Sequence, residues 1–305
     1  MQLCPICAIE ARATTALSAA HIRTRLVEEF SAAVPAALPL GDYQLRQCDT
    51  CELVFADPMR AGSGEFYRWV TSFPAYHAEA RWEWGVLRRI LIARKHARVL
   101  ELGCGEGKFL AAIADLKHVD AQGIDLNEES VARARAKGLK ATRATIEEFS
   151  SAGERFDVIS MSHVLEHVED PLAVVKRCKA LLNAGGEIIF SVPYSPTSRE
   201  YRRLDIMNLP PHHLTRWNIV ALRRLASVAG LSFSYEMRRA KPVVKRALRH
   251  TVESVGGPGR TNALRSAATA LTHPKQFLDA LRLYRSRECV DGRRAADEIL
   301  VRLSL

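Results

Sequence analysis

The chain has 305 residues, 48% of them hydrophobic and 26% charged, with a formal net charge of +10. One domain usually takes about 100 to 200 residues, so this length predicts one large domain and one small one. No apolar run reaches the roughly 18 residues of a membrane-spanning helix, and MQLCPICAIE lacks the basic flank and apolar core of a secretion signal, which predicts a cytoplasmic location.

Two Cys-x-x-Cys pairs stand near the N-terminus, Cys4 with Cys7 and Cys48 with Cys51. Two tight turns of this kind present four thiolates to a tetrahedral zinc ion. In a long chain without an export signal, metal explains the spacing better than disulfides do. We therefore predict a zinc-ribbon-like module over residues 1–60, with a structural zinc ion and a helical insert. A redox dithiol or unrelated cysteines are the alternatives.

Residues 61–95 form an aromatic stretch followed by apolar residues at helical spacing, which predicts a helix leading into the main domain. Strand and helix patterns then alternate through residues 96–239. The helix in DPLAVVKRCKALLNAGG is expected to stop at its glycines. This alternation predicts a doubly wound, Rossmann-like sheet with helices on both faces. Residues 291–305 are predicted to form the last strand of this sheet. The basic helical segment 240–290 is therefore predicted to be an insertion before that strand.

The positive charge is concentrated in and beside that insertion. The residues concerned are Arg238, Arg239, Lys241, Lys245, Arg246, Arg249 and Arg260. A solvated helix face is the simplest interpretation. Contact with a phosphorylated carrier or an anionic membrane surface is the alternative.

A glycine-rich turn, ELGCGEG, joins a buried strand to a helix at residues 101–107. Such a turn lets a ligand approach the backbone closely. The dinucleotide fingerprint requires glycine where Lys108 stands. Asp125 closes the next strand, where a carboxylate can accept hydrogen bonds from both ribose hydroxyls. With SHVLEHVEDP and GGEIIFSVP following in order, the series closely resembles the class I S-adenosylmethionine-dependent methyltransferases over roughly residues 80–237.

That resemblance implies a seven-stranded sheet whose last strand is antiparallel, and a cofactor site. The residues implied around the methionine part of S-adenosylmethionine are Glu101, Gly103, Cys104, Gly105 and Gly107. Asp125 holds the ribose and Leu126 packs on the adenine. Thr145 and Ile146 replace the usual acidic and small residues near the adenine amino group, so a hydroxyl or backbone group is expected there. Ser162 and His163 are counted with this site.

The segment PPHHLTRW, residues 210–217, follows the fifth strand, where acceptor-binding loops lie in this fold. Imidazole titrates near neutral pH, so His212 or His213 is predicted to be the general base that deprotonates the acceptor. Adjacent side chains are expected to point in different directions, so that only one of the two faces the pocket. A structural hydrogen bond or substrate positioning is the alternative.

A second group of polar residues lies in HVLEH. On a helix, His163, Glu166 and His167 would share one face, where they could bind a catalytic divalent ion, cap the helix or form the pocket wall. Glu166 and His167 are predicted to contact the substrate. In the aromatic stretch that precedes the domain, Tyr76 and His77 are predicted to belong to a lid that excludes water.

The combination of a cysteine module and this catalytic domain resembles bacterial methyltransferases that act on sugars, nucleotide-linked sugars or other biosynthetic intermediates. We predict O-methylation of a sugar or secondary metabolite. C-methylation of a sugar, RNA methylation and a non-enzymatic docking role for the zinc module are the alternatives. The sequence disfavours nucleic acid because SMSHVLEH replaces the Asn-Pro-Pro-Tyr or Asp-Pro-Pro-Tyr common in base-modifying enzymes. The oligomeric state stays open.

Overall fold

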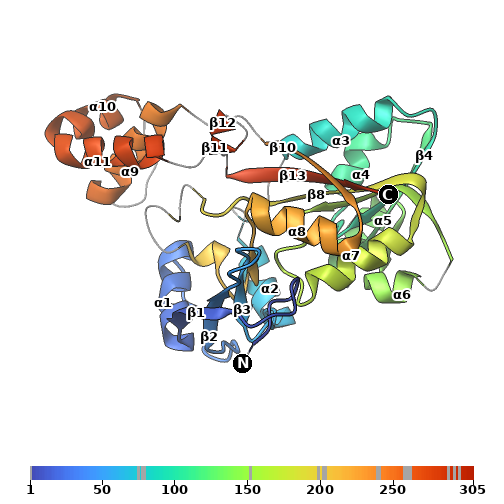
Figure 1. Cartoon of the computed structure of the whole chain (residues 1–305), viewed down its shortest axis with the longest axis horizontal. Coiled ribbons are helices and arrows are strands. Elements are labelled where there is room, and N and C mark those ends of the chain that lie inside the picture. The colour runs from blue at the N-terminus through green and yellow to red at the C-terminus, as the bar shows by residue number, and fades with distance from the viewer. Residues whose placement is uncertain are drawn as a thin grey trace. The chain divides into compact units, whose positions relative to one another are not determined.

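The computed structural model describes residues 2–73, 76, 80–150, 153–197, 200, 205–237, 242–256, 263–286, 289–290, 293–294 and 297–305 (Figure 1). The chain forms two compact units, the first comprising Met1–Pro193, Ile206–Glu236 and Leu300–Leu305, and the second Tyr194–Asp205 and Met237–Ile299.

The strands are β1 Arg12–Leu17, β2 Tyr43–Gln47, β3 Val54–Asp57, β4 Ala97–Leu102, β5 Val119–Asp125, β6 Ala141–Arg143, β7 Phe156–Ser162, β8 Leu182–Pro193, β9 Thr215–Arg216, β10 Ser232–Met237, β11 Cys289–Val290, β12 Arg293–Arg294 and β13 Glu298–Ser304. The α-helices are α1 Ala19–Phe30, α2 Gly64–Thr71, α3 Trp82–Ile92, α4 Lys108–Ile113, α5 Glu128–Ala136, α6 Ile146–Ser150, α7 Pro171–Ala180, α8 Ile219–Ala229, α9 Val243–Gly256, α10 Ala263–Thr272 and α11 Pro274–Ser286. A 3-10 turn, η2, spans Ile206–Asn208.

A seven-stranded sheet in the order β10-β13-β8-β7-β4-β5-β6 forms the centre of the first unit (Figure 1). β4 pairs in parallel with β5 and β7, β5 with β6, and β7 with β8, whereas the last strand, β13, is antiparallel. The predicted fold class is therefore confirmed. Because parallel strands end at the same edge of a sheet, the segments that follow β4, β5, β7 and β8 gather there.

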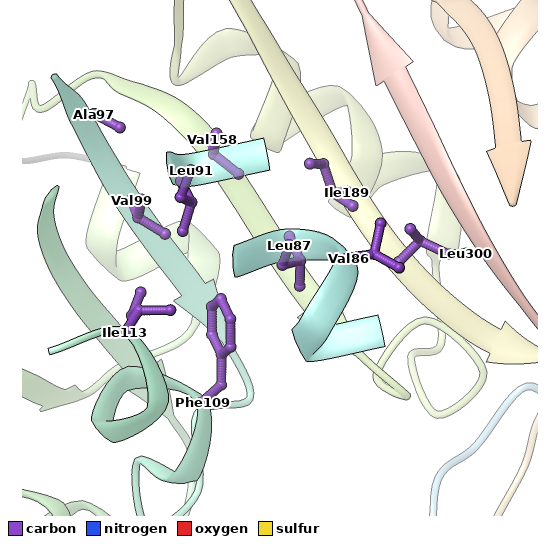
Figure 2. Close-up of a cluster of buried hydrophobic side chains, with 10 residues drawn as sticks. All are labelled: Val86, Leu87, Leu91, Ala97, Val99, Phe109, Ile113, Val158, Ile189 and Leu300. Carbon is purple, nitrogen blue, oxygen red and sulfur yellow. The ribbon is translucent and has the colours of Figure 1, made fainter. Parts of the chain in front are cut away.

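A cluster of buried apolar side chains packs α3 and α4 onto one face of this sheet (Figure 2). Val86, Leu87 and Leu91 are the contribution of α3, at the helical spacing expected from the sequence. They lie against residues of four strands and of α4: Ala97, Val99, Phe109, Ile113, Val158, Ile189 and Leu300. This core holds β4, β7 and β8 together beneath α3.

Two local predictions were wrong. Residues 163–167 form a turn rather than a helix, because His163 has a positive φ of 55° and the Glu166 carbonyl accepts a hydrogen bond from the distant Leu214 N. Helix α7 ends at Ala180, before the glycines of LLNAGG, and those glycines lie within β8, which begins at Leu182. The turn matters for function because it redirects the side chains of HVLEH.

A second, antiparallel sheet, ordered β1-β2-β3-β9, contains the segments on either side of α1. Its last strand, β9, comes directly after the His212–His213 pair. Two further backbone hydrogen bonds hold the same segment, from Ala56 N to Leu214 O (2.8 Å) and from Gly62 N to Pro211 O (3.1 Å). The N-terminal module thus shares a sheet with the segment that carries the predicted base.

Helices α9, α10 and α11 belong to the second unit. Arg246 does not lie on a solvated face: it is buried, its guanidinium stacks 4.7 Å from the Tyr284 ring centroid, and it lies 3.6 Å from Asp297. Lys245 and Arg249 are exposed. The other basic residues predicted here lie outside the described residues: Arg238, Arg239, Lys241 and Arg260. In the described part of the chain, no helix has the length and apolarity needed to cross a membrane.

Candidate active site

The glycine turn after β4 adopts the left-handed backbone conformation at Gly103, Gly105 and Gly107, with φ values of 70°, 51° and 73°. A Cβ atom at Gly103 would lie 2.6 Å from Val164 Cγ2, and one at Gly107 would lie 2.5 Å from Leu139 Cδ1. A Cβ at Gly105 would meet no atom within 4 Å. Packing therefore excludes side chains at the outer two glycines, whereas Gly105 borders open space that a ligand can occupy.

Asp125 is held firmly at the end of β5. Its Oδ2 accepts a hydrogen bond from Gly105 N (2.8 Å) and its Oδ1 accepts one from Asn127 N (2.8 Å). Each oxygen keeps a lone pair for another donor. Leu126 is 69% exposed, so an apolar surface lies beside the carboxylate. A sugar with two hydroxyls and an aromatic base fits these two side chains.

Glu101, at the end of β4, is the buried acid of this turn. Its Oε2 has no hydrogen-bond partner among the described residues. Burial, together with the charge of Asp125, raises the pKa of Glu101 well above its usual value. A ligand that brings a cationic amine to this place would satisfy the carboxylate. Burial likewise raises the pKa of the Cys104 thiol to about 12, so this cysteine is a neutral lining residue.

Thr145 caps the short helix α6. Its hydroxyl accepts a hydrogen bond from Glu148 N (3.1 Å), while Glu148 Oε2 accepts one from Thr145 N (2.8 Å), which is a capping box. Ile146 is buried. The Thr145 hydroxyl thus caps the helix with one lone pair and keeps its O–H group for another partner.

His163 follows β7 between two buried carboxylates. Its Nδ1 lies 3.1 Å from Glu166 Oε1 and its Nε2 lies 3.6 Å from Glu83 Oε1. Burial by itself raises the pKa of Glu166, but the hydrogen bond from His163 and the charges of His163 and His167 outweigh it, and the net shift is downward. Ser162 Oγ accepts a hydrogen bond from Trp84 Nε1 (3.2 Å). The turn is thereby fixed against α3.

The sequence reasoning missed Glu83, which is 1% exposed in α3. Its Oε1 accepts a hydrogen bond from Ser191 Oγ (3.1 Å), and its Oε2 has no partner among the described residues. The available signal was an acidic residue between Trp82 and Val86, on a helix whose apolar face packs on the sheet.

Three imidazole rings meet next to this turn. The ring centroids of His212 and His213 lie 4.4 Å apart, and each lies 4.7 Å from that of His167. The expectation that His212 and His213 point in different directions was therefore wrong. Both their backbone N–H groups donate to Leu209 O (3.1 and 3.0 Å), so the segment is a tight turn that brings successive side chains to one side.

A hydrogen bond at Nδ1 orients each of the three rings. These nitrogens lie 2.9, 2.8 and 2.6 Å from oxygen acceptors, namely Met207 O for His212, Asn208 Oδ1 for His213 and His212 O for His167. Because these oxygens only accept, each Nδ1 carries the proton and donates it. The lone pair of every ring is consequently on Nε2.

Tyrosines from the predicted lid region complete this cluster. The Tyr76 hydroxyl donates to His212 Nε2 (3.0 Å), and the Tyr67 hydroxyl donates to His212 O (3.4 Å). Burial, with a smaller effect of the neighbouring His167, lowers the pKa of His212 to about 3, and burial also lowers the pKa of His167 and of His213. His77 lies outside the described residues.

The four N-terminal cysteines form a separate cluster in which all Sγ atoms lie within 4.8 Å of one another; they are Cys4, Cys7, Cys48 and Cys51. None of the four is in a disulfide. The two turns match: each first cysteine N donates to the carbonyl five residues on, and a left-handed residue, Ala8 or Glu52, follows each second cysteine. Four convergent thiols on two matched turns are a donor set that fits a structural zinc ion.

Comparisons with known proteins identify the family of the main domain. A family model described as a methyltransferase domain matches residues 75–234. A ubiquinone biosynthesis O-methyltransferase of Bordetella avium is 35% identical over 131 residues, covering 40% of this chain and 53% of that protein. The corresponding enzyme of Alkalilimnicola ehrlichii is 30% identical and covers 47% and 67%, respectively. This chain thus spans between about half and two thirds of these two curated relatives.

The fold is shared with a crystal structure of an S-adenosylmethionine-dependent methyltransferase from Archaeoglobus fulgidus. Its TM-score is 0.52 at 16% identity, and the match covers 78% of this chain and 100% of the other. At this identity the likeness concerns the fold alone.

Proposed function

Because this chain belongs to the class I S-adenosylmethionine-dependent methyltransferases, we propose that it transfers the sulfonium methyl group to a hydroxyl oxygen of a small molecule. The observation that carries this proposal is the histidine cluster beside the glycine turn. Val164, two residues from Glu166, packs on Gly103, so the turn that supplies His167 touches the turn proposed to hold the cofactor. Relatives named O-methyltransferases support oxygen as the atom methylated.

In this proposal the cofactor lies along the carboxyl edge of β4 and β5. Gly105 leaves space for its methionine part, and the unpartnered Oε2 of Glu101 meets its ammonium group. Asp125, fixed by two backbone N–H groups, accepts from the ribose hydroxyls. Leu126 supplies the apolar surface for the adenine.

The chain's own contribution to the reaction is to place the acceptor and remove its proton. Methyl transfer is an in-line displacement: the acceptor oxygen forms its bond to carbon as the carbon–sulfur bond breaks, and sulfur keeps the electron pair. His212 Nε2 already accepts from Tyr76, whereas His213 Nε2 has no hydrogen bond among the described residues. We therefore favour His213 over His212 as the group that takes the hydroxyl proton.

Methyl transfer from labelled S-adenosylmethionine to a panel of phenols, sugars and nucleotide-linked sugars tests this function. The expected product carries the label on oxygen. His213→Ala should lower kcat by roughly 100- to 10,000-fold, the usual contribution of a general base, with binding of S-adenosylhomocysteine retained. Labelled product on carbon or nitrogen, or undiminished turnover by the variant, would contradict the corresponding part of the proposal. Sugars and their nucleotide conjugates remain the acceptors proposed from the sequence.

Asp125→Asn tests the ribose contact separately. The substitution keeps the shape of the side chain but removes the charge and replaces one acceptor by a donor. Since a hydrogen bond to a charged group contributes about 1.5 to 3 kcal/mol, affinity for S-adenosylhomocysteine should fall roughly 10- to 100-fold. Calorimetric titration measures this effect, and unchanged affinity would remove Asp125 from the site.

We also propose a structural zinc ion at the cysteine cluster. Arg224 Nε donates to Cys7 Sγ (3.4 Å), so a cation from α8 supports the thiolate charge that such a site carries. Cysteines kept reduced for metal binding fit the cytoplasm, which stays the predicted location. Exposed Lys245 and Arg249 of the second unit remain candidates for contact with an anionic carrier or membrane surface.

A further inference from the structure

We infer that His167, His212 and His213 together bind a divalent transition-metal ion, in addition to the zinc proposed at the cysteines. Each ring donates its Nδ1 proton to an oxygen, at 2.6 to 2.9 Å. Metal-binding histidines are oriented in this way, because the hydrogen bond fixes the tautomer and directs the other nitrogen at the ion. One donor atom from each ring lies within 4.8 Å of the other two.

The spacing of the rings also fits a shared ion. With metal–nitrogen distances of about 2.0 to 2.1 Å, imidazoles around one ion have ring centroids about 4.5 Å apart at right angles and about 5.2 Å apart at the tetrahedral angle. The observed separations are 4.4, 4.7 and 4.7 Å.

The charge around the cluster favours a cation. Glu166 is fully buried, its Oε1 lies 4.0 Å from His213 Nε2, and its Oε2 has no partner among the described residues. A carboxylate buried this close to the rings favours a cation among them, and a divalent ion at the Nε2 atoms would supply that charge.

These three ligands differ from the set that the sequence suggested, in which His163, Glu166 and His167 would share one face of a helix. His163 is turned towards Glu83 and Glu166, and His167 is the histidine of that motif that joins the new cluster. Three imidazoles suit Zn²⁺, Fe²⁺, Ni²⁺ or Cu²⁺ better than Mg²⁺ or Ca²⁺. Tyr76 Oη, 3.0 Å from His212 Nε2, is placed to contact an ion or a group bound to it.

The role of this ion rests on the proposed function and deepens it. Three protein ligands leave a coordination position open, as in catalytic sites. The acceptor hydroxyl would take that position and release its proton to water, because the ion lowers the hydroxyl pKa. The resulting oxygen anion then forms its bond to the methyl carbon as the sulfonium carbon–sulfur bond breaks. With the ion bound, His213 Nε2 is a ligand, and the ion takes over the task assigned above to the base.

Metal analysis of the full-length protein, saturated with Zn²⁺ and then desalted, tests the site. The expected content is two ions per chain for the wild type, and one for His167→Ala or for His213→Ala. His96→Ala, at an exposed histidine between α3 and β4, is the matched control and should keep two. Cys48→Ser should lose the other ion, which assigns each ion to its cluster. Binding of S-adenosylhomocysteine reports that each variant is folded.

Replacement of zinc by Co²⁺ gives an independent readout. The cysteine site should show intense sulfur-to-cobalt absorption that Cys48→Ser abolishes, and the histidine site weaker visible bands that His167→Ala abolishes. One ion per chain in the saturated wild type, or two in both histidine variants, would overturn the inference. Two ions with the expected losses, but no methyl transfer to any oxygen acceptor, would uphold the metal site and reject the proposed function.

Discussion

We expect Gly105→Val to abolish cofactor binding while the fold remains intact. Gly105 has a φ of 51°, and a Cβ there points into open space that we assign to the methionine part of the cofactor. A β-branched residue in this backbone region costs roughly 1 to 3 kcal/mol, which a stability of about 5 to 15 kcal/mol tolerates. Its two methyl groups would occupy the ligand's space. We expect affinity for S-adenosylhomocysteine to fall more than about 100-fold.

Gly185→Val is the matched control for this experiment. Gly185 has a φ of 72° and also meets no atom within 4 Å of an added Cβ, but it lies near the start of β8, away from the carboxyl edge of the sheet. The control variant should bear a similar backbone strain and bind the ligand as the wild type does. Equal affinities of the wild type and the Gly105 variant would show that no ligand lies against this glycine.

Cys48→Ser should disable turnover without preventing cofactor binding. A structural zinc site can contribute on the order of 10 kcal/mol to folding, so loss of one thiolate should release the ion and destabilise the surrounding sheet. That sheet includes β9, and Ala56 N bonds Leu214 O next to the histidine pair. Displacement of a reacting group by about 1 Å can cost on the order of 100-fold in rate, and we expect a fall in kcat of that size.

The measurements are zinc content, kcat and affinity for S-adenosylhomocysteine, determined on the same preparation. Cys178→Ala is the control: Cys178 is a buried cysteine of α7 outside the metal cluster. It should keep the zinc and most of the activity, although the cavity lowers stability somewhat. A zinc-free Cys48 variant with full turnover would mean that the module does not position the histidines.

The sequence was informative where local pattern and tertiary packing agree. The alternation of β4, α4, β5 and α5 was predicted because buried parallel strands are continuously apolar and helices have a 3.6-residue period. The Asn127 cap of α5 is an example: its side chain accepts from Ser130 N (3.1 Å), as the cap signal indicates. The glycine turn between β4 and α4 was also predicted from the sequence, and its Gly105 borders open space.

The rest depends on contacts between distant segments, which no local pattern records. β9 has two residues, too few for a periodic signal, and exists because β3 pairs with it. The turn at His163 overrides a helical pattern because Leu214 bonds the Glu166 carbonyl. For the same reason His167 joins His212 and His213, a grouping that the spacing of HVLEH does not indicate.

A crystal structure of the complex with S-adenosylhomocysteine tests the central claim most directly. We expect the amino-acid part to lie against Gly105 near Glu101, both ribose hydroxyls to bond Asp125, and the sulfur to face the cluster of His167, His212 and His213. Density for the ligand elsewhere, or a sulfur directed away from the three histidines, would contradict the assignment of this edge of the sheet as the methyl-transfer site.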